Sequence, residues 1–214
     1  MSTTTTALTA LPGTDIWRKP PNTNILNAPT HPSPLLFQPL RSFQRARLTL
    51  TLPPTSSLTQ YDQAGLLLHL RRTPTPTTTT EATDAALDKW LKTGVEFADD
   101  VPWLSTVACD SWADWSVTPL PAAAAAAAPV VATVEARRET DVHGTSLWVY
   151  VLELDSERAV VKRTPLREVA WFFAVEEGWE VGVGAYAARP GQAREEGLRA
   201  EVRLWKSGLG EEWR

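Results

Sequence analysis

Apolar and polar residues alternate along several stretches of this chain. Between Phe43 and Leu52, alanine and leucine at every second position are separated by arginine and threonine. The same alternation recurs from Leu198 to Trp205. A period of two places successive side chains on opposite faces of a strand. Both stretches are therefore predicted to be β-strands with one buried face.

Three further stretches are rich in aromatic and β-branched residues and are bounded by turn-forming residues. They run from Ser146 to Leu154, from Arg167 to Val175 and from Gly178 to Ala188, and we predict them as strands. No stretch shows a sustained apolar stripe at helical spacing with capping residues. Strand after strand with almost no helix predicts an all-β fold, either two sheets packed face to face or a barrel.

Two more predicted strands, 61–70 and 88–97, have an unusual second face. Alternation assigns one face of each to the core, with Ala64, Leu66, Leu68 and Leu70 in the first strand and Leu91, Thr93, Val95 and Phe97 in the second. The opposite faces carry Tyr61, Gln63, Gly65, Leu67 and His69, and Trp90, Lys92, Gly94 and Glu96. An ordinary solvated face would show Lys, Glu and Thr without a Trp or Tyr beside an amide.

An aromatic ring beside an amide and charged groups suits a ligand that bears many hydroxyl groups. The ring offers a flat apolar face for stacking, and the polar groups offer directed hydrogen bonds. On a strand, Lys92 and Glu96 share a face at about 13 Å separation. The alternative is a convex surface with charge pairs between neighbouring strands, and spacing alone leaves both interpretations open.

Proline clusters divide the chain. Residues 1–39 contain six prolines in their second half and little periodicity, so we expect an irregular segment that wraps the domain. Residues 40–214 are expected to form a single β-sandwich domain, since 214 residues with 43% hydrophobic content bury one core. Two low-complexity stretches, a Thr-rich one at 73–86 and an Ala-rich one at 121–130, are interpreted as surface loops.

Composition narrows the function classes. A net charge of −4 with scattered Lys and Arg disfavours a nucleic-acid partner. The single Cys109 cannot form an internal disulfide, and no apolar run of membrane-spanning length occurs, so we expect a cytoplasmic protein without a membrane partner. The three histidines, His31, His69 and His143, have no metal-ligand spacing, and we expect neither a metal nor a cofactor.

Five segments resemble one microbial family. They read YDQAGLLL (61–68), WLKTGVEF (90–97), PWLSTVACDSWADWSVTPLP (102–121), LREVAWFF (166–173) and VGVGAYAARP (181–190). Together they resemble the family named after regulation of enolase protein 1, within the concanavalin A-like lectin/glucanase superfamily, over about Phe43 to Trp205. The resemblance implies a jelly-roll sandwich of two antiparallel sheets with one concave face. Tyr150 stands where that family usually has a basic residue.

Two other motifs are interpreted as structural. Glu153, Asp155 and Glu157 would share a strand face, as glycosidase carboxylates do, but aromatic and glycine neighbours are missing, so a solvated turn is favoured. The stretch from Gly182 to Ala187 matches a dinucleotide-binding pattern, but the required helix cannot follow because Arg189, Pro190 and Gly191 come next. Its alternating glycines indicate a closely approaching neighbouring layer.

These observations lead to three functional hypotheses. The first is a protein that binds a carbohydrate or another polyhydroxyl compound on its concave sheet. Its ligand-binding residues are predicted to be Tyr61, Gln63, Trp90, Lys92, Glu96, Asp110, Trp115, Trp148, Tyr150 and Arg167, the last holding a carboxylate in place. The second is a glycoside hydrolase, lyase or isomerase with Glu96 and Asp110 as acid and base. The third is a regulatory module that docks a protein partner through its sheet face or its Trp-rich edge.

Overall fold

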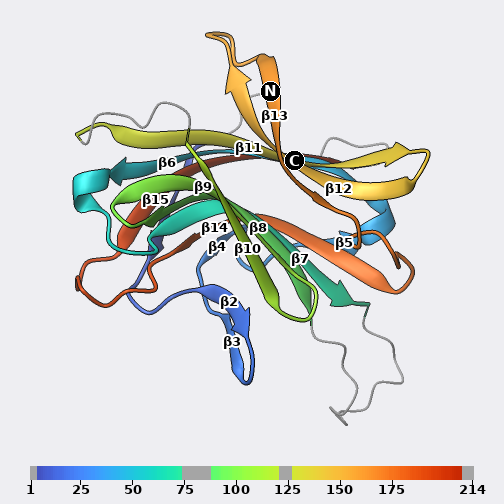
Figure 1. Cartoon of the computed structure of the whole chain (residues 1–214), viewed down its shortest axis with the longest axis horizontal. Helices are drawn as coiled ribbons and strands as arrows, with labels where there is room; N and C mark the ends of the chain where they lie inside the picture. Colours follow the sequence, from blue (N-terminus) through green and yellow to red (C-terminus); the bar gives the residue numbers. More distant parts are fainter. Residues whose placement is uncertain (1–3, 74–87, 121–126, 209–214) are drawn as a thin grey trace.

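The computed structural model describes residues 4–73, 88–120 and 127–208, and it is an all-β sandwich (Figure 1). Within these residues the chain forms fifteen strands and two short 3-10 helices, η1 (Leu40–Ser42) and η2 (Thr55–Ser57). Two antiparallel sheets of six and seven strands face each other, and a two-stranded hairpin lies outside them. The predicted two-sheet architecture is confirmed, and the barrel is excluded.

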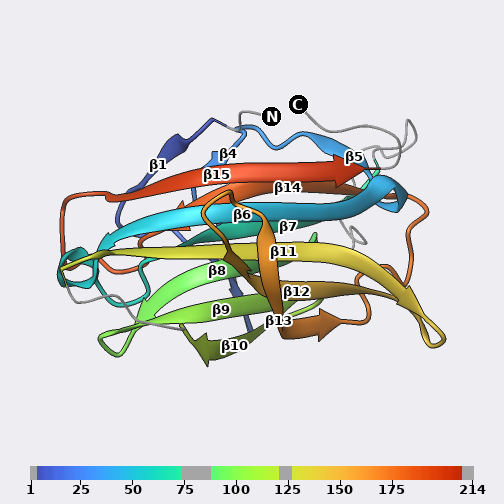
Figure 2. The same ribbon diagram turned by 90° about the horizontal axis from the view of Figure 1, so that it is seen from above.

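The six-stranded sheet has the order β1-β15-β6-β11-β12-β13. Its strands are β1 (Thr6–Ala10), β15 (Leu198–Gly208), β6 (Phe43–Pro54), β11 (Pro129–Asp141), β12 (Gly144–Leu154) and β13 (Val160–Val169). The N-terminal strand β1 therefore lies beside the C-terminal strand β15 (Figure 2). The end of the β12–β13 hairpin folds over the outer face of this sheet (Figure 2).

The seven-stranded sheet has the order β10-β9-β8-β7-β14-β4, and β5 also pairs with β14. Its strands are β10 (Ala113–Pro119), β9 (Val101–Cys109), β8 (Lys89–Ala98), β7 (Gln63–Arg72), β14 (Trp179–Ala188), β4 (Thr30–His31) and β5 (Phe37–Pro39). The strands 61–70 and 88–97 expected from the sequence correspond to β7 and β8, which are direct neighbours.

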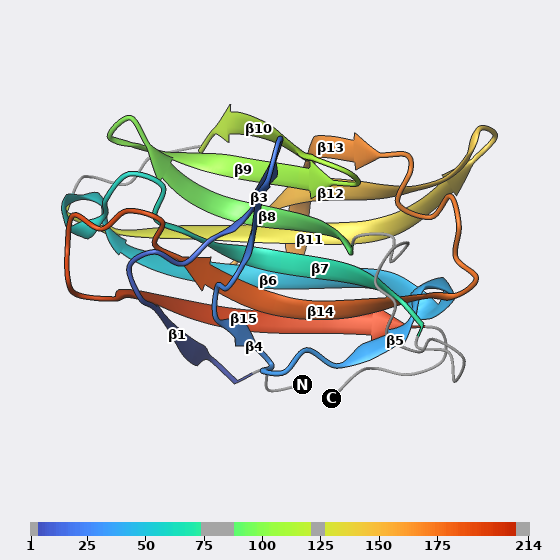
Figure 3. The same ribbon diagram turned by 90° about the horizontal axis from the view of Figure 1, so that it is seen from below.

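The hairpin of β2 (Ile16–Lys19) and β3 (Thr23–Leu26) crosses the outer face of the seven-stranded sheet (Figure 3). Ile16 is buried there with Leu67, Trp90 and Val107. This small cluster is separate from the main core, which lies between the sheets. Ile16 and the partly buried Trp17, which packs against the same cluster, therefore attach an N-terminal element to the sheet.

The main core follows the alternation that the sequence shows. Its β7 and β8 members include Ala64, Leu66, Leu68 and Leu70 together with Leu91, Val95 and Phe97, as predicted, and β6 contributes Ala46, Leu48, Leu50 and Leu52. Burial of these side chains between two sheets supplies most of the apolar area removed from water. The alternation of apolar and polar residues therefore predicted which side chains of these strands form the core.

Residues 1–39 contain more regular structure than we expected. They form five short strands, and three of these, β1, β4 and β5, belong to the two sheets. The glycines of β14 explain part of this arrangement, because a Cβ on Gly184 would lie 2.5 Å from Leu35 and one on Gly182 would lie 3.0 Å from Phe37. The interpretation of these glycines as sites of close approach is confirmed.

The predicted strand 167–175 differs from the structure. Strand β13 ends at Val169, and a turn follows in which Phe172 N–H donates to Val169 and Ala174 N–H to Trp171. Phe172 and Phe173 leave the strand to close one end of the main core, where Phe173 stacks on Phe43. Most of the expected loops at 73–86 and 121–130 lies outside the described residues.

Candidate functional site

Gln63, Lys92 and Glu96 share the outer face of the seven-stranded sheet. Gln63 on β7 lies directly opposite Glu96 on β8, and Leu67 lies opposite Lys92. The glycines Gly65 and Gly94 face each other between these two pairs. The faces assigned from the alternation are therefore those of the structure, and the three polar side chains form one candidate site.

Lys92 is the centre of a buried hydrogen-bond network. Its side chain is 2% exposed, and Nζ donates to Gln63 Oε1 at 2.8 Å. The Tyr186 hydroxyl of β14 donates to the same oxygen at 3.2 Å. Asp15, immediately before the β2–β3 hairpin, places Oδ1 3.5 Å from Lys92 Nζ. A buried ammonium is thus held by one amide and one carboxylate from different parts of the chain.

Glu96 forms a second chain of hydrogen bonds on the same face. It is 7% exposed, and its Oε2 accepts a hydrogen bond of 2.7 Å from Ser105 Oγ of β9. Ser105 Oγ in turn accepts from Trp115 Nε1 of β10 at 3.0 Å. The indole at the edge of the sheet is therefore connected to the buried carboxylate through a single hydroxyl.

The pKa values of both charged groups are displaced toward the neutral form. Burial lowers the pKa of Lys92, and the charges of Asp15 and Glu96 only partly oppose this effect. Burial raises the pKa of Glu96, against the charge of Lys92 and the hydrogen bond from Ser105. Opposite displacements of an acid and a base on one face are typical of functional sites.

Two aromatic rings beside this network remain accessible. Tyr61 is 43% exposed and Trp115 is 40% exposed. Their ring centroids lie 6.5 Å apart in an edge-to-face arrangement. Trp90, also predicted as a stacking surface, is buried in the cluster beneath the hairpin with Ile16. Tyr61 and Trp115 are therefore the predicted rings that a ligand can reach.

The hairpin adds residues that the sequence analysis did not select. Besides Asp15, it places Trp17 with its ring 5.8 Å from Lys92 Nζ, and Arg18 is buried, with Nε donating to Asn24 Oδ1 at 3.0 Å. Burial raises the pKa of the Cys109 thiol, and Arg18 opposes this effect. No periodic signal marked these side chains, because a four-residue strand is too short to establish a period.

Ser105 and Tyr186 were also missed, although a signal for each was present. Within 101–109, alternation places Ser105 on the same face as Val107 and Cys109. Tyr186 follows the alternating glycines of β14 at the same spacing. Ser105 and Tyr186 could have been selected if the outward-facing positions of their strands had been aligned with those of β7 and β8. That alignment depends on the pairing register between strands, which the sequence does not give.

The other predicted site residues lie elsewhere. Asp110 follows the end of β9 and pairs with Lys89 at the opposite end of β8 from Glu96. Trp148 and Tyr150 lie on β12 of the six-stranded sheet, where their rings stack at 6.0 Å. Arg167 on β13 pairs with the Asp114 carboxylate of β10 and donates to Ser116 Oγ at 3.2 Å. The structure therefore separates these four residues from the Lys92–Glu96 network.

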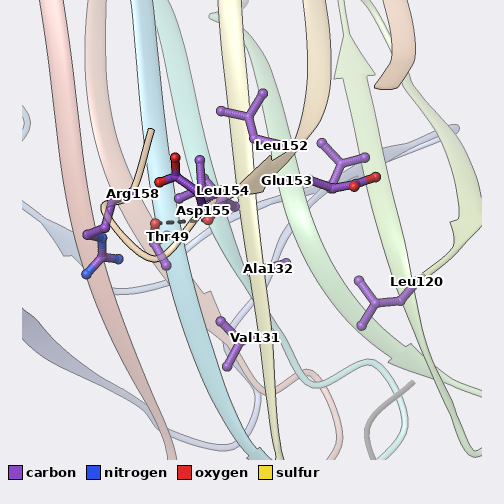
Figure 4. A pocket seen from close by; sticks show the side chains of 11 residues that line it. Thr49, Leu120, Val131, Ala132, Leu152, Glu153, Leu154, Asp155 and Arg158 are labelled. Atoms are coloured by element: carbon purple, nitrogen blue, oxygen red, sulfur yellow. Dashed lines mark hydrogen bonds between the residues drawn. The ribbon is translucent and has the colours of Figure 1, made fainter. Parts of the chain in front are cut away.

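A pocket of about 340 Å³ lies on the opposite side of the molecule, beneath the end of the β12–β13 hairpin (Figure 4). Its walls are largely apolar and include Leu120, Val131 and Leu152. The two carboxylates of its lining are already engaged, since Glu153 pairs with Lys162, and Asp155 Oδ1 accepts from two backbone N–H groups of the turn. It contains no predicted site residue, and the perturbed acid and base make the Lys92–Glu96 network the stronger candidate.

No group of three or more His, Cys, Asp or Glu side chains suited to a metal ion occurs among the described residues. The same part of the chain contains no helix that is long and apolar enough to span a membrane.

Comparison with known proteins identifies the family. The model of a family described as proteins of unknown function, DUF1349, matches residues 2–207. This chain belongs to the DUF1349 family. An uncharacterised protein from Emericella nidulans is 40% identical over 186 residues, which is 86% of this chain and 76% of that protein.

A solved structure of a functionally unknown protein from Saccharomyces cerevisiae is similar in fold. It has a TM-score of 0.56 and 18% sequence identity, and the similarity covers 96% of this chain and 89% of that one. At this identity the likeness concerns the fold alone. The DUF1349 match extends over the N-terminal hairpin, so the hairpin belongs to the family region.

Proposed function

We propose that this DUF1349 protein binds a carbohydrate or a related polyhydroxyl compound at the outer face of the seven-stranded sheet. Tyr61 and Trp115 are the stacking surfaces in this proposal, and Glu96, Lys92 and Gln63 supply hydrogen bonds. The observation that carries the proposal is the direct link from the exposed Trp115 indole through Ser105 to the buried Glu96 carboxylate.

The chemistry of this arrangement suits hydroxyl groups. A sugar presents an apolar ring face that stacks on an aromatic side chain, and its hydroxyls both donate and accept hydrogen bonds. Glu96 supplies an acceptor and Lys92 a donor, and Gln63 supplies a donor from its amide nitrogen, because its oxygen already accepts from Lys92 and Tyr186. Because these groups are already fixed by Ser105, Tyr186 and Asp15, little side-chain entropy is lost when a ligand binds.

An enzyme acting on a sugar-like substrate is the second candidate. It is favoured by the raised pKa of Glu96 and the lowered pKa of Lys92, since a raised acid pKa and a lowered base pKa suit proton transfer to and from a substrate. The sequence predicts Glu96 and Asp110 as acid and base, but Asp110 pairs with Lys89 at the other end of β8. In the enzyme hypothesis, Lys92 therefore takes the place of Asp110 as the second acid–base group. The exchange Glu96→Gln distinguishes the two functions, because a binding protein keeps most of its affinity whereas an enzyme loses turnover by orders of magnitude.

The family resemblance, the cellular location and a protein partner are also part of the proposal. The resemblance to the regulation of enolase protein 1 family, within the concanavalin A-like superfamily, supports a sheet-face ligand site. A cytoplasmic location is proposed on the ground of the single buried Cys109. Docking of a protein partner on the same face is the third possibility and is an outcome that the following experiment can reveal.

The test is a thermal-shift screen with neutral sugars, sugar acids and polyols, followed by calorimetry on each hit. Selective binding to the folded protein raises the melting temperature by mass action. Trp115→Ala should weaken binding by about 1–3 kcal/mol through lost stacking and burial.

Trp112→Ala is the matched control, because Trp112 lies just before β10, is 45% exposed, and is not part of the network around Glu96. It should leave affinity unchanged. Equal losses in both variants, or no shift with any compound, would refute the sugar site and direct attention to a protein partner.

A further inference from the structure

Arginines gather on the outer face of the six-stranded sheet, on the side of the sandwich opposite the proposed sugar site. In one cross-strand row, Arg45 of β6 lies opposite Arg137 of β11, which lies opposite Trp148 of β12. The neighbouring row along the same face consists of Trp205, Arg47, Glu135 and Tyr150. Both rows face away from the main core, so these side chains form one surface.

The carboxylates of this surface are already committed. Glu135 is fully buried and accepts from Arg47 Nη2 at 3.0 Å and from Arg163 Nε at 2.9 Å. Although burial acts to raise the pKa of Glu135, these hydrogen bonds hold it below its usual value. Glu139 Oε1 lies 3.2 Å from Arg137 Nε and accepts from the Tyr150 hydroxyl at 2.9 Å. Glu135 and Glu139 are thus each neutralised by an arginine, and Glu168 of β13, which lies opposite Trp148, accepts a hydrogen bond from Ser146 Oγ.

Arg45, unlike Arg47, Arg137 and Arg163, has no acidic partner on the described part of this surface. Among the described residues it has no carboxylate within ion-pair distance, and its guanidinium lies over the Trp205 ring at 4.3 Å from the centroid. Burial lowers the pKa of Arg45, and Arg47, Arg137 and Arg163 lower it further, against the single opposing charge of Glu135. Four arginines (Arg45, Arg47, Arg137 and Arg163) therefore accompany three carboxylates (Glu135, Glu139 and Glu168) on this surface, in a chain whose formal net charge is −4.

Like charges directly opposite each other on paired strands destabilise a sheet. Arg45 and Arg137 occupy such a position. The arrangement becomes favourable when an anion lies between them, because guanidinium groups bind oxyanions through charge-assisted, bidentate hydrogen bonds. We propose that Arg45 and Arg137 form an anion site for a small ligand that carries a phosphate or sulfate group.

The aromatic side chains define how such a ligand is held. Trp205 fixes the plane of the Arg45 guanidinium, and the stacked pair Trp148–Tyr150 flanks Arg137 on the next strand. Arg137 itself is oriented by Glu139. A tetrahedral oxyanion offers enough oxygens to engage both guanidinium forks at once, whereas a carboxylate offers only two. The site thus favours tetrahedral dianions over acetate.

The experiment measures binding of inorganic phosphate and of sulfate to the full chain by calorimetry and thermal shift at constant ionic strength, with acetate and chloride as reference anions. Phosphate or sulfate should raise the melting temperature more than chloride does. Arg45→Gln should weaken the affinity for the tetrahedral anion about tenfold or more, since it removes charge-assisted hydrogen bonds. A preference between phosphate and sulfate would indicate which ester the natural ligand bears.

Arg72→Gln is the matched control, because the Arg72 guanidinium also lies over a Trp ring, that of Trp179 at 4.6 Å, but outside the arginine surface. It should leave anion affinity unchanged. Equal stabilisation by chloride, or the same anion affinity in Arg45→Gln and wild type, would overturn the proposal. Failure of the sugar screen would not affect it, because the two sites share no residue.

Discussion

At the scale of single residues, burial decides the chemistry of the candidate site. Lys92 and Glu96 would be ordinary surface charges on a solvated strand, but each is almost completely covered. Desolvation disfavours the charged form of each group, and neither the attraction between them nor their hydrogen bonds compensates fully. Burial therefore lowers the pKa of Lys92 and raises that of Glu96.

The raised pKa of Glu96 predicts a pH dependence of stability. The folded protein holds a proton at Glu96 more readily than the unfolded chain does, so this contribution to stability is complete below the ordinary pKa of 4.5. It is lost as the pH rises through the raised pKa. Glu96→Gln removes the ionisation, so the variant should lose less unfolding free energy than wild type as the pH rises from about 4.5 through the raised pKa of Glu96, measured by urea titration.

Glu168→Gln serves as the control for this measurement. Glu168 also accepts a hydrogen bond of 2.7 Å from a serine, Ser146, but it is exposed. The exchange should leave the pH profile of wild type unchanged. A Glu96→Gln profile that runs parallel to wild type over the whole range would contradict the assignment of Glu96.

At the scale of elements, the β2–β3 hairpin contributes to the site although it is too short to be stable alone. An isolated two-stranded hairpin is marginal in water. The hairpin is held by burial of Ile16 against Leu67, Trp90 and Val107 and by the approach of Asp15 to Lys92. Because the same apolar contact covers Trp90, the position of the hairpin decides which aromatic rings of the sheet are accessible.

Ile16→Ala should therefore loosen the hairpin. Removal of a fully buried isoleucine costs about 2–5 kcal/mol, and amide hydrogen exchange of β2 and β3 should accelerate accordingly. Ile25→Ala is the comparison, because Ile25 lies on the same hairpin, opposite Trp17, but is only half-buried. Similar exchange rates in both variants would show that Ile16 does not anchor the hairpin.

At the scale of the whole molecule, the ends of the chain complete the sandwich. Strand β15 lies between β1 and β6 in the six-stranded sheet, so the last described strand is internal rather than at an edge. It also contributes Leu198, Ala200 and Val202 to the main core. The six-stranded sheet is thus complete only when β15 has paired with β1 and β6, and the outer faces of the two sheets carry separate polar clusters.

A chain that ends at Gly197 should consequently lack a cooperative unfolding transition. The truncation leaves β6 without a partner on one side and β1 without any, and it exposes core side chains of both sheets. Near-ultraviolet circular dichroism during urea unfolding provides the measurement. A chain that lacks residues 1–10 loses only the edge strand β1 and should still unfold cooperatively. A sharp transition in the C-terminal truncation would show that β15 is dispensable.

The sequence by itself determined the class of fold and the faces of the strands. Strict alternation at β6, β7, β8 and β15 is a local property of the backbone, since successive side chains of a strand point to opposite sides whatever the strand packs against. For that reason the core residues of these strands, and the shared face of Gln63, Lys92 and Glu96, could be predicted before any contact was known.

Only the tertiary structure decided which strands are neighbours and what covers each face. Asp110, just after the end of β9, pairs with Lys89 at the opposite end of β8 from Glu96, and Tyr150 lies in the other sheet, because strand order and register arise from contacts between distant parts of the chain. The hairpin that buries Trp90 and brings Asp15 to Lys92 has no period of its own. Its position depends on apolar area that exists only after the seven-stranded sheet has formed.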